Sequence, residues 1–177
     1  MITMNLAMSG VDHTMAGIEE RESLAITGDK QIRILEYGKN HPEISGIVLL
    51  STCNRVELYL SLTDNSELTA DSVLKENGIV FPKEHKVFTG KDVYSHLSSL
   101  ACGVQSQIFG EDQILTQVKK AIAFSRENNA ADSVLEVLFR TAVTAAKKVK
   151  TTVRYNYTHS RMAITKKTDV TSVDKDN

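Results

Sequence analysis

The fold is decided by the stretch IVLLSTCNRVELYLSL at residues 47–62, in which two apolar segments flank a short polar turn. The first segment, 47–50, is a continuous apolar run of the kind found in a strand buried on both faces. After the turn, leucines alternate with Glu57 and Tyr59, and this period of two predicts a second strand. The stretch therefore predicts a β-hairpin with Cys53 at its polar apex and Glu57 on the face opposite the leucines.

The segments before and after this hairpin add short strands and helices. They are a strand at residues 2–8, helices at 18–25 and 29–38, a helix at 66–78 and a short strand at 86–88. Gly38 is expected at the C-terminal cap of its helix. This order predicts an α+β fold in which helices cover one face of a small, mostly antiparallel sheet.

The pattern becomes helical from Thr89 onward. Thr89 and Asp92 have the spacing of a capping box, and two further helices follow, the last beginning near Asp132. We expect a domain at 1–158, with an α+β part at 1–88 and a helical part at 89–158. Residues 159–177 are polar and unpatterned, which predicts a disordered tail.

The composition is that of a globular protein without a general attraction to nucleic acid. The 177 residues are 41% hydrophobic and 24% charged, with a formal net charge of −1. A local basic patch, Lys147, Lys150 and Arg154, is either a solvated helix face or a phosphate contact. We see neither a long apolar run nor a leader, so we expect a cytoplasmic protein without membrane contact.

Two cysteines and one histidine are candidates for chemistry. Two thiols are too few for a disulfide scaffold or a zinc site, so no metal is expected. Cys53 lies in a polar turn, where Arg55 could favour its thiolate, although a small space-filling residue is the alternative. Cys102 falls in an apolar helix stripe and is expected to be buried. His96, at the edge of that stripe, is either a core histidine or a proton-transfer group.

A connection rich in glycine and polar residues joins two of the helices at 103–113. Its carboxylates, Glu111 and Asp112, could favour the N-terminus of the following helix or bind an ammonium group. Gly110 is the last glycine in the chain, and the sequence contains no G-x-G-x-x-G dinucleotide-binding fingerprint.

Together these segments resemble the glutamyl-tRNA reductase family, from about residue 10 to about residue 154. The resemblance is carried by GVDHTMAG at 10–17 with IEERESL at 18–24, STCNRVE at 51–57, HL at 96–97, ACGVQS at 101–106, GEDQIL at 110–115 and QVK at 117–119. The sequence departs from the family pattern at Met15, Gly17 and Asp112.

The resemblance implies that Cys53 is the nucleophile that attacks the aminoacyl ester of glutamyl-tRNA, and that His96 acts near the reacting ester. From the chemistry of the residues we further hypothesise that Arg55 pairs with the side-chain carboxylate of the substrate, and that a carboxylate such as Glu111 faces its α-ammonium group. The positions implied to surround the glutamyl group are Thr52, Asn54, Arg55, Glu57, Ser106, Glu111, Asp112, Gln113 and Gln117.

Members of this family are NADP-dependent oxidoreductases. They use NADPH to reduce the thioester to glutamate-1-semialdehyde, a precursor in tetrapyrrole and heme synthesis. The resemblance does not extend to the NADPH-binding or dimerisation domains. We therefore expect this chain to form the thioester but not to reduce it, so that the thioester would hydrolyse slowly. The expected partners are glutamyl-tRNA and the next enzyme, glutamate-1-semialdehyde aminomutase. The alternatives are a non-catalytic module that binds tRNA or protein, and an inactive structural remnant.

Overall fold

A computed structural model describes residues 4–103 and 112–171, with side chains described at 4–103 and 113–152. The elements, in order, are β1 (Leu6–Asp12), α1 (Ile18–Leu24), α2 (Asp29–Asn40), β2 (Ile44–Ser51), β3 (Arg55–Leu62), α3 (Ala70–Glu76), β4 (Lys86–Thr89), α4 (Lys91–Ala101), α5 (Asp112–Glu127) and α6 (Ser133–Thr171). The α+β class is confirmed.

The four strands form one antiparallel sheet in the order β2-β3-β1-β4. The predicted hairpin is confirmed, because β2 and β3 pair with Leu49 opposite Leu58 and Leu50 opposite Glu57. β2 lies at one edge, which is partly covered: Ile47 donates its amide to the carbonyl of Ala130 (2.9 Å), and Ser125 Oγ donates to the carbonyl of Ile47. This edge therefore offers fewer open groups to another chain.

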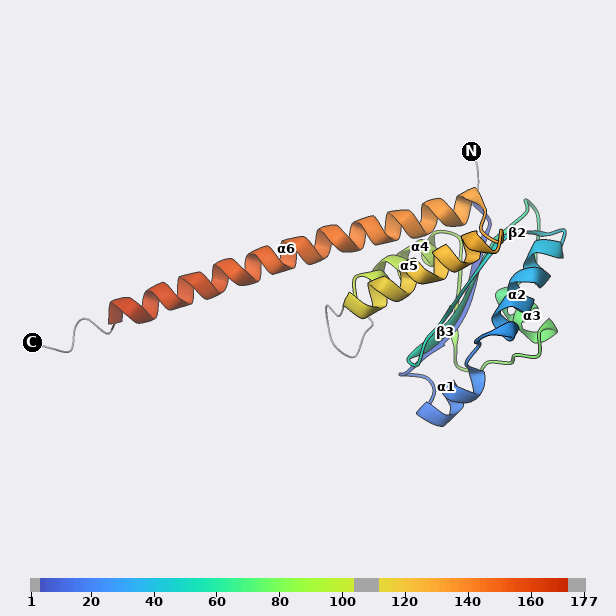
Figure 1. The fold of residues 1–177 in the computed structure, drawn as a ribbon, viewed down its shortest axis with the longest axis horizontal. Helices are drawn as coiled ribbons and strands as arrows, with labels where there is room; N and C mark the ends of the chain where they lie inside the picture. The colour runs from blue at the N-terminus through green and yellow to red at the C-terminus, as the bar shows by residue number, and fades with distance from the viewer. Residues whose placement is uncertain (1–3, 104–111, 172–177) are drawn as a thin grey trace, which may run out of the picture.

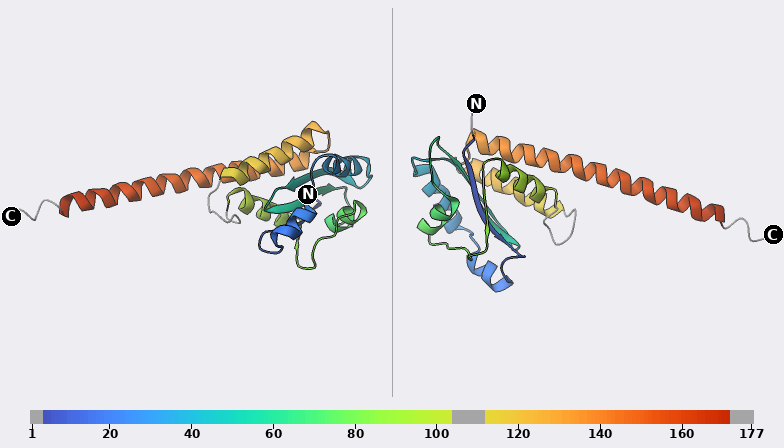
Figure 2. Two further views of the ribbon diagram at one scale, coloured as in Figure 1. Left: turned by 60° about the horizontal axis from the view of Figure 1, so that its bottom comes forward. Right: turned by 180° about the vertical axis from the view of Figure 1, so that it is seen from behind.

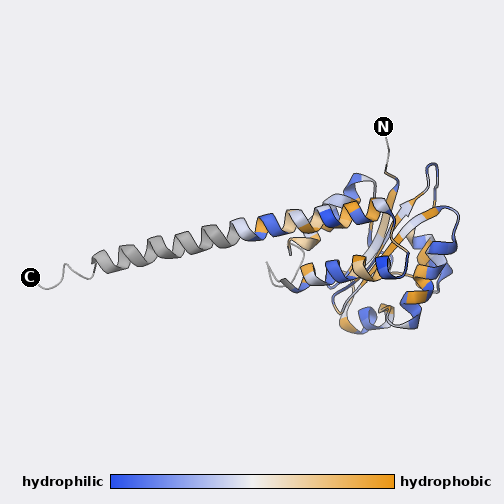
Figure 3. Ribbon diagram, turned by 45° about the horizontal axis from the view of Figure 1, so that its top comes forward, coloured by the Kyte–Doolittle hydropathy of each residue, from blue (hydrophilic) through white to orange (hydrophobic). Residues whose placement is uncertain are grey.

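Helices cover both faces of the sheet, which corrects the expectation of one covered face (Figures 1 and 2). One face packs on α2 and α3, through side chains that include Leu58, Leu60 and Ile34. The other packs on α4, α5 and the start of α6, through side chains that include Tyr59 and Leu97. Burial on both faces explains the continuous apolar run in β2: Ile47 and Leu49 enter one core, while Val48 and Leu50 enter the other. Figure 3 shows hydrophobic residues in the strands and in the helices that cover them.

Several element boundaries differ from those expected. β1 begins at Leu6 and runs through Ser9-Gly10 to Asp12, so the glycine does not end it. Gly38 does not cap α2, which continues to Asn40; a Cβ at Gly38 would lie 2.5 Å from Ile47 Cγ2. This glycine is therefore explained by the close approach of helix and sheet, and not by a helix end.

Two helix starts also differ. Thr69 caps α3 with a capping box completed by Ser72, so Ser66 is not the cap. Thr89 ends β4, and Gly90, at φ 58°, is the N-cap of α4 without a side-chain cap bond. The predicted Thr89–Asp92 capping box is therefore wrong, because Thr89 is the last residue of β4 and lies one position before the N-cap.

α6 is the longest helix, with 39 residues, or about 58 Å at 1.5 Å per residue. Its start is fixed by Asp132, whose Oδ1 accepts the amide of Leu135 (2.9 Å) and whose Oδ2 accepts the hydroxyl of Ser61 (2.7 Å). The helix then projects beyond the rest of the molecule (Figure 1). Its backbone is helical as far as Thr171, which differs from the disordered tail expected from residue 159.

Candidate active site

The thiol of Cys53 is exposed at the apex of the β2–β3 hairpin. Thr52 builds the turn around it. Its Oγ1 accepts the amides of Asn54 (3.2 Å) and Arg55 (3.3 Å), and its own amide donates to the carbonyl of Arg55 (2.8 Å). The side chain of Thr52 therefore satisfies the backbone of the turn and leaves the thiol of the next residue outside.

Arg21 of α1 holds this turn from the side. Its Nε donates to the carbonyl of Cys53 (3.2 Å) and its Nη1 donates to the carbonyl of Ala16 (2.6 Å), while the residue is only 9% exposed. Sequence reasoning missed Arg21, because it stands among the charged residues of a short helix whose neighbours are exposed. The one sequence signal for Arg21 was that it lies in the IEERESL segment, which is part of the family resemblance.

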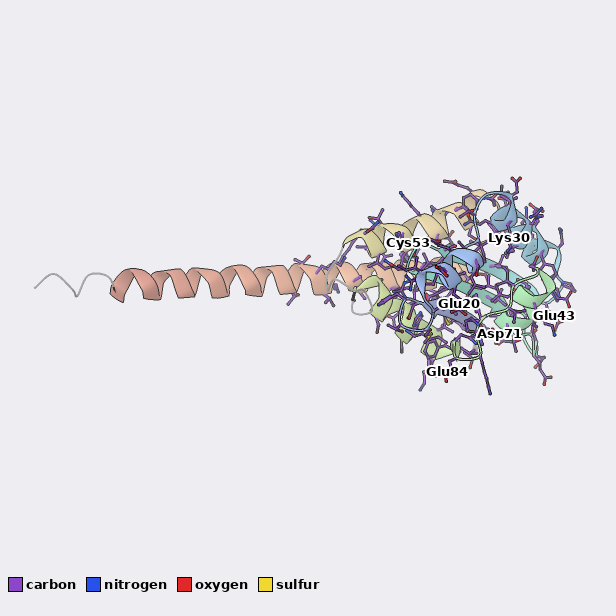
Figure 4. The ribbon with its side chains drawn as sticks, turned by 90° about the horizontal axis from the view of Figure 1, so that it is seen from below. Glu20, Lys30, Glu43, Cys53, Asp71 and Glu84 are labelled. Atoms are coloured by element: carbon purple, nitrogen blue, oxygen red, sulfur yellow. The ribbon has the colours of Figure 1, made fainter. Side chains whose placement is uncertain are left out.

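A cavity of about 500 Å³ opens beside the thiol, between the end of β2, α2 and α5. Cys53 is labelled in Figure 4. Of the predicted site residues, the cavity is lined by Thr52, Cys53 and Gln117. Its other polar residues were not predicted: Gln31, Ser51, Lys120 and Glu127. Lys120 could have been found, because it follows Gln117 by three positions and such residues share a helix face.

A buried polar cluster lies on the sheet face that packs on α4. His96 Nε2 donates to Glu57 Oε2 (2.7 Å), and the hydroxyl of Tyr59 donates to Glu57 Oε1 (2.9 Å). Arg55 Nη1 lies 3.8 Å from Glu57 Oε2. The side chains of these four residues are almost fully enclosed, with Glu57 1% exposed and Arg55 2%. Both oxygens of Glu57 therefore have partners within the protein.

The packing around Glu57 fixes its position. Burial, followed by the charge of Glu57, raises the pKa of Tyr59 well above its ordinary value, so the phenol keeps the proton that it donates. The ring of His96 stacks on Phe88 with centroids 5.1 Å apart. Gly10 lies opposite Glu57 on β1, and a Cβ there would be 2.7 Å from Glu57 Cγ. The glycine makes room for the carboxylate side chain.

A second buried carboxylate, Asp12, ends β1. It accepts from Lys86 Nζ (2.8 Å) and from the hydroxyl and amide of Thr14 (2.5 and 2.9 Å). Burial alone would raise the pKa of Asp12, but the hydrogen bonds from Lys86 and Thr14 outweigh it and hold the pKa well below its ordinary value. Asp12 is therefore a charged anchor between β1, β4 and the following turn.

The predicted residues fall into separate groups. Thr52, Cys53 and Gln117 meet at the cavity, whereas Arg55, Glu57 and His96 form the buried cluster. Asn54 is half-buried in the turn and Gln113 is exposed on α5. Ser106, Glu111 and the side chain of Asp112 lie outside the described residues. Cys102, expected to be buried, is partly exposed at the C-cap of α4.

Among residues 4–103 and 113–152, whose side chains are described, no three side chains of histidine, cysteine, aspartate or glutamate cluster in a way that suits a metal ion. None of the helices within residues 4–103 and 112–171 combines the length and the hydropathy needed to cross a bilayer.

Comparison with known proteins gives one consistent result. The family model "Glutamyl-tRNAGlu reductase, N-terminal domain" matches residues 9–153. The glutamyl-tRNA reductase of Acetivibrio thermocellus is 45% identical over 164 residues, covering 90% of this chain and 50% of the relative. That of Alkaliphilus oremlandii is 47% identical over 157 residues, covering 86% and 47%. A probable multifunctional siroheme biosynthesis protein of Ruminiclostridium josui is 38% identical over 164 residues, covering 87% and 31%.

The fold has a solved counterpart as well. Glutamyl-tRNA reductase from Methanopyrus kandleri matches with a TM-score of 0.66 and 33% identity over 81% of this chain and 33% of that one. The chain spans about half the length of the first two curated relatives. From the match over residues 9–153 and these identities, the chain belongs to the glutamyl-tRNA reductase family and carries its N-terminal domain.

Proposed function

We propose that this chain performs the covalent step of glutamyl-tRNA reduction. The Cys53 thiolate attacks the carbonyl carbon of the glutamyl ester, a carbon–sulfur bond forms, and the bond to the terminal ribose oxygen breaks. The released ribose hydroxyl takes up a proton, and the glutamyl group remains as a thioester. The observation that carries this proposal is the exposed thiol at the rim of a 500 Å³ cavity, on a turn held by Thr52 and Arg21.

The substrate's carboxylate and ammonium groups are assigned within the same proposal. Arg55 lies two residues from the thiol and is enclosed, so a carboxylate that reached it would form a strong, water-excluded pair. His96 acts beside the reacting ester, held by Glu57. The remaining positions, Thr52, Asn54, Ser106, Glu111, Asp112, Gln113 and Gln117, surround the glutamyl group, and Glu111 faces its ammonium.

The resemblance implies that Glu57 surrounds the glutamyl group, but Tyr59 and His96 occupy both of its oxygens in the buried cluster. We therefore assign Glu57 the task of positioning His96 and Arg55. This assignment agrees with Gly10, whose missing side chain leaves the space that Glu57 fills.

Full-length members of the family use NADPH to reduce the thioester. The residues described here do not fit that cofactor, because their only sheet is antiparallel, whereas a dinucleotide pyrophosphate is bound at a strand–glycine loop–helix junction of a parallel sheet. The proposal for this chain therefore ends at the thioester. Reduction would yield an amino aldehyde, which is the substrate of glutamate-1-semialdehyde aminomutase, and that enzyme is proposed as the next partner.

The test is mass spectrometry of the 177-residue chain after mixing with glutamyl-tRNA. We expect a glutamyl adduct on Cys53 that hydroxylamine removes. Cys53→Ser should abolish it, whereas Cys102→Ser, the matched control at the other cysteine, should keep it. An adduct that survives Cys53→Ser would contradict the proposal. Salt-sensitive tRNA binding without any adduct would favour a non-catalytic binding module instead.

A further inference from the structure

A second cavity, of about 380 Å³, lies between α5 and α6. Four of its lining side chains are cationic and only one is acidic. The cationic residues are Lys119, Arg126, Arg140 and Lys147, and the acidic residue is Glu136. This basic groove stands out in a chain whose formal net charge is −1. Its charge is therefore a local feature of two facing helices.

The acidic residue is already occupied. Arg126 donates from Nε and Nη2 to the two oxygens of Glu136 (2.7 and 2.8 Å). This hydrogen-bonded pair is the first cause of the lowered pKa of Glu136, and the nearby charge of Arg140 adds to it. Glu136 is thus bound at one end of the groove and does not neutralise the lysines.

The two lysines face each other across the groove, one from each helix. Lys119 is close enough to Lys147 that the Lys147 charge is the main cause of the lowered pKa of Lys119. Neither lysine takes part in an ion pair among the residues with described side chains. Two neighbouring ammonium groups repel each other, and an anion placed between them would remove that repulsion.

The groove and the thiol cavity lie on two sides of α5. Gln117, Lys120 and Phe124 line the thiol cavity, whereas Lys119 and Arg126 line the groove. An α-helix is about 10–12 Å across with its side chains, a width that a few nucleotides span. A strand whose end lies at Cys53 could therefore cross α5 and reach the groove.

We propose that the basic groove between α5 and α6 binds the phosphodiester backbone of the tRNA whose glutamyl end reacts at Cys53. The inference rests on the proposed function, because it takes the same substrate. Phosphate fits because its several oxygens accept hydrogen bonds from two ammonium groups at once, and lysine binds phosphate as a point charge. Contacts of this kind hold and orient a nucleic acid without reading its sequence.

The test compares the wild-type chain with Lys119→Gln/Lys147→Gln and with the charge-reversed Lys119→Glu/Lys147→Glu. The matched control is Lys39→Gln/Lys75→Gln, which removes the same charge from α2 and α3 on the other face of the sheet. Affinity for glutamyl-tRNA is measured over a series of salt concentrations. Urea unfolding of each variant checks that the chain remains folded.

A plot of log affinity against log salt concentration has a negative slope. We expect the glutamine pair to make this slope less steep by about 1–2, since each lost phosphate contact removes roughly 0.7–0.9 from its magnitude. Charge reversal should weaken binding at least about tenfold, and the control should leave affinity and slope unchanged. Wild-type affinity and slope in the Lys119→Gln/Lys147→Gln chain would overturn the proposal. An equal loss in the control would overturn it as well, because the effect would then follow from net charge.

A small substrate separates this inference from the proposed chemistry. The glutamyl ester of adenosine carries the reacting bond but no phosphate. We expect both groove variants to form the Cys53 adduct with it at the wild-type rate, and to lose efficiency with glutamyl-tRNA only. If no variant forms an adduct with either substrate, the thioester proposal fails while the salt-slope measurement still decides on the groove. A slowed reaction with the small ester would contradict a role limited to phosphate binding.

Discussion

Replacement of Gly10 by alanine tests the packing that holds Glu57 in place. The new Cβ would lie 2.7 Å from Glu57 Cγ and 3.3 Å from Glu57 Cβ and Cδ. Carbon atoms pack at about 3.5–4.0 Å, so Glu57 must move by roughly 1 Å. That movement would stretch its bonds to His96 and Tyr59, which are 2.7 and 2.9 Å long.

The expected loss of stability follows from two opposing effects. Forcing a methyl group into a packed interior costs about 1–3 kcal/mol. Alanine also restricts the unfolded chain, which stabilises the protein by about 0.4–1 kcal/mol where the backbone suits it. The free energy of unfolding of Gly10→Ala should therefore fall by about 1–2 kcal/mol, and with a urea dependence of roughly 2 kcal/mol per molar the midpoint should fall by about 0.5–1 M.

Urea unfolding followed by circular dichroism measures this shift. Gly17→Ala is the matched control, because a Cβ at Gly17 meets nothing within 4 Å. Its midpoint should equal or slightly exceed that of the wild type, because alanine restricts the unfolded chain there as well and no clash opposes it. In Gly10→Ala/Glu57→Ala the clash is gone, so the double variant should lose less stability than the sum of the single variants. Strict additivity, or a Gly10→Ala midpoint equal to that of the control, would refute the proposed contact.

Three further substitutions test other contacts of the site. Arg21→Gln should slow adduct formation at Cys53 at saturating glutamyl-tRNA, because the turn that carries the thiol loses its hydrogen bond from Arg21. The half-saturating concentration should stay unchanged. Single-turnover kinetics measure both quantities, and added guanidinium should rescue the rate. Asp12→Asn should destabilise the chain by about 1.5–3 kcal/mol at pH 7. The pKa of Asp12 is lower in the folded chain than in the unfolded chain, where it is about 3.9. The contribution of Asp12 to the free energy of unfolding is therefore full above about pH 3.9 and is lost as the pH falls toward the folded pKa. The difference in urea midpoint between the wild type and Asp12→Asn should accordingly narrow in acid. Tyr59→Phe leaves one oxygen of the buried Glu57 without its donor and should lower the free energy of unfolding by about 1–3 kcal/mol, measured by thermal or urea unfolding. An unchanged midpoint would argue against the hydrogen bond between Tyr59 and Glu57.

Local patterns predicted the hairpin and its apex correctly because both follow from side-chain alternation. Residues 56–62 alternate between aliphatic side chains and polar or aromatic ones, and the structure places these sets on two different faces of the sheet. The exposure of Cys53 follows from the polar turn that carries it. The family resemblance, confirmed by the comparisons, supplied the expected role that the pattern alone left open.

What the sequence did not reveal depends on contacts between segments that are far apart. Gly38 and Gly10 look like a helix end and a strand end, but each is a glycine because another side chain, Ile47 or Glu57, approaches it closely. Arg21 reaches Cys53 across 32 positions. The second covered face was missed because an alternating strand shows which side chains are apolar, and not which helix will lie over the polar side.

The division of β3 between an apolar row and a charged row also bears on how the chain finds its pairing during folding. A slip of β3 by one residue against its neighbours would turn every side chain to the opposite face. Arg55 and Glu57 would then meet the aliphatic layer under α2 and α3, and leucines would face His96. Such a misaligned sheet would separate Glu57 from His96 and bury Arg55 and Glu57 among aliphatic side chains, which is far more costly than a mismatch among apolar side chains. The buried side chains of Arg55 and Glu57 would thus select the native register of β3 and disfavour mispaired hairpins before the helices pack over the sheet.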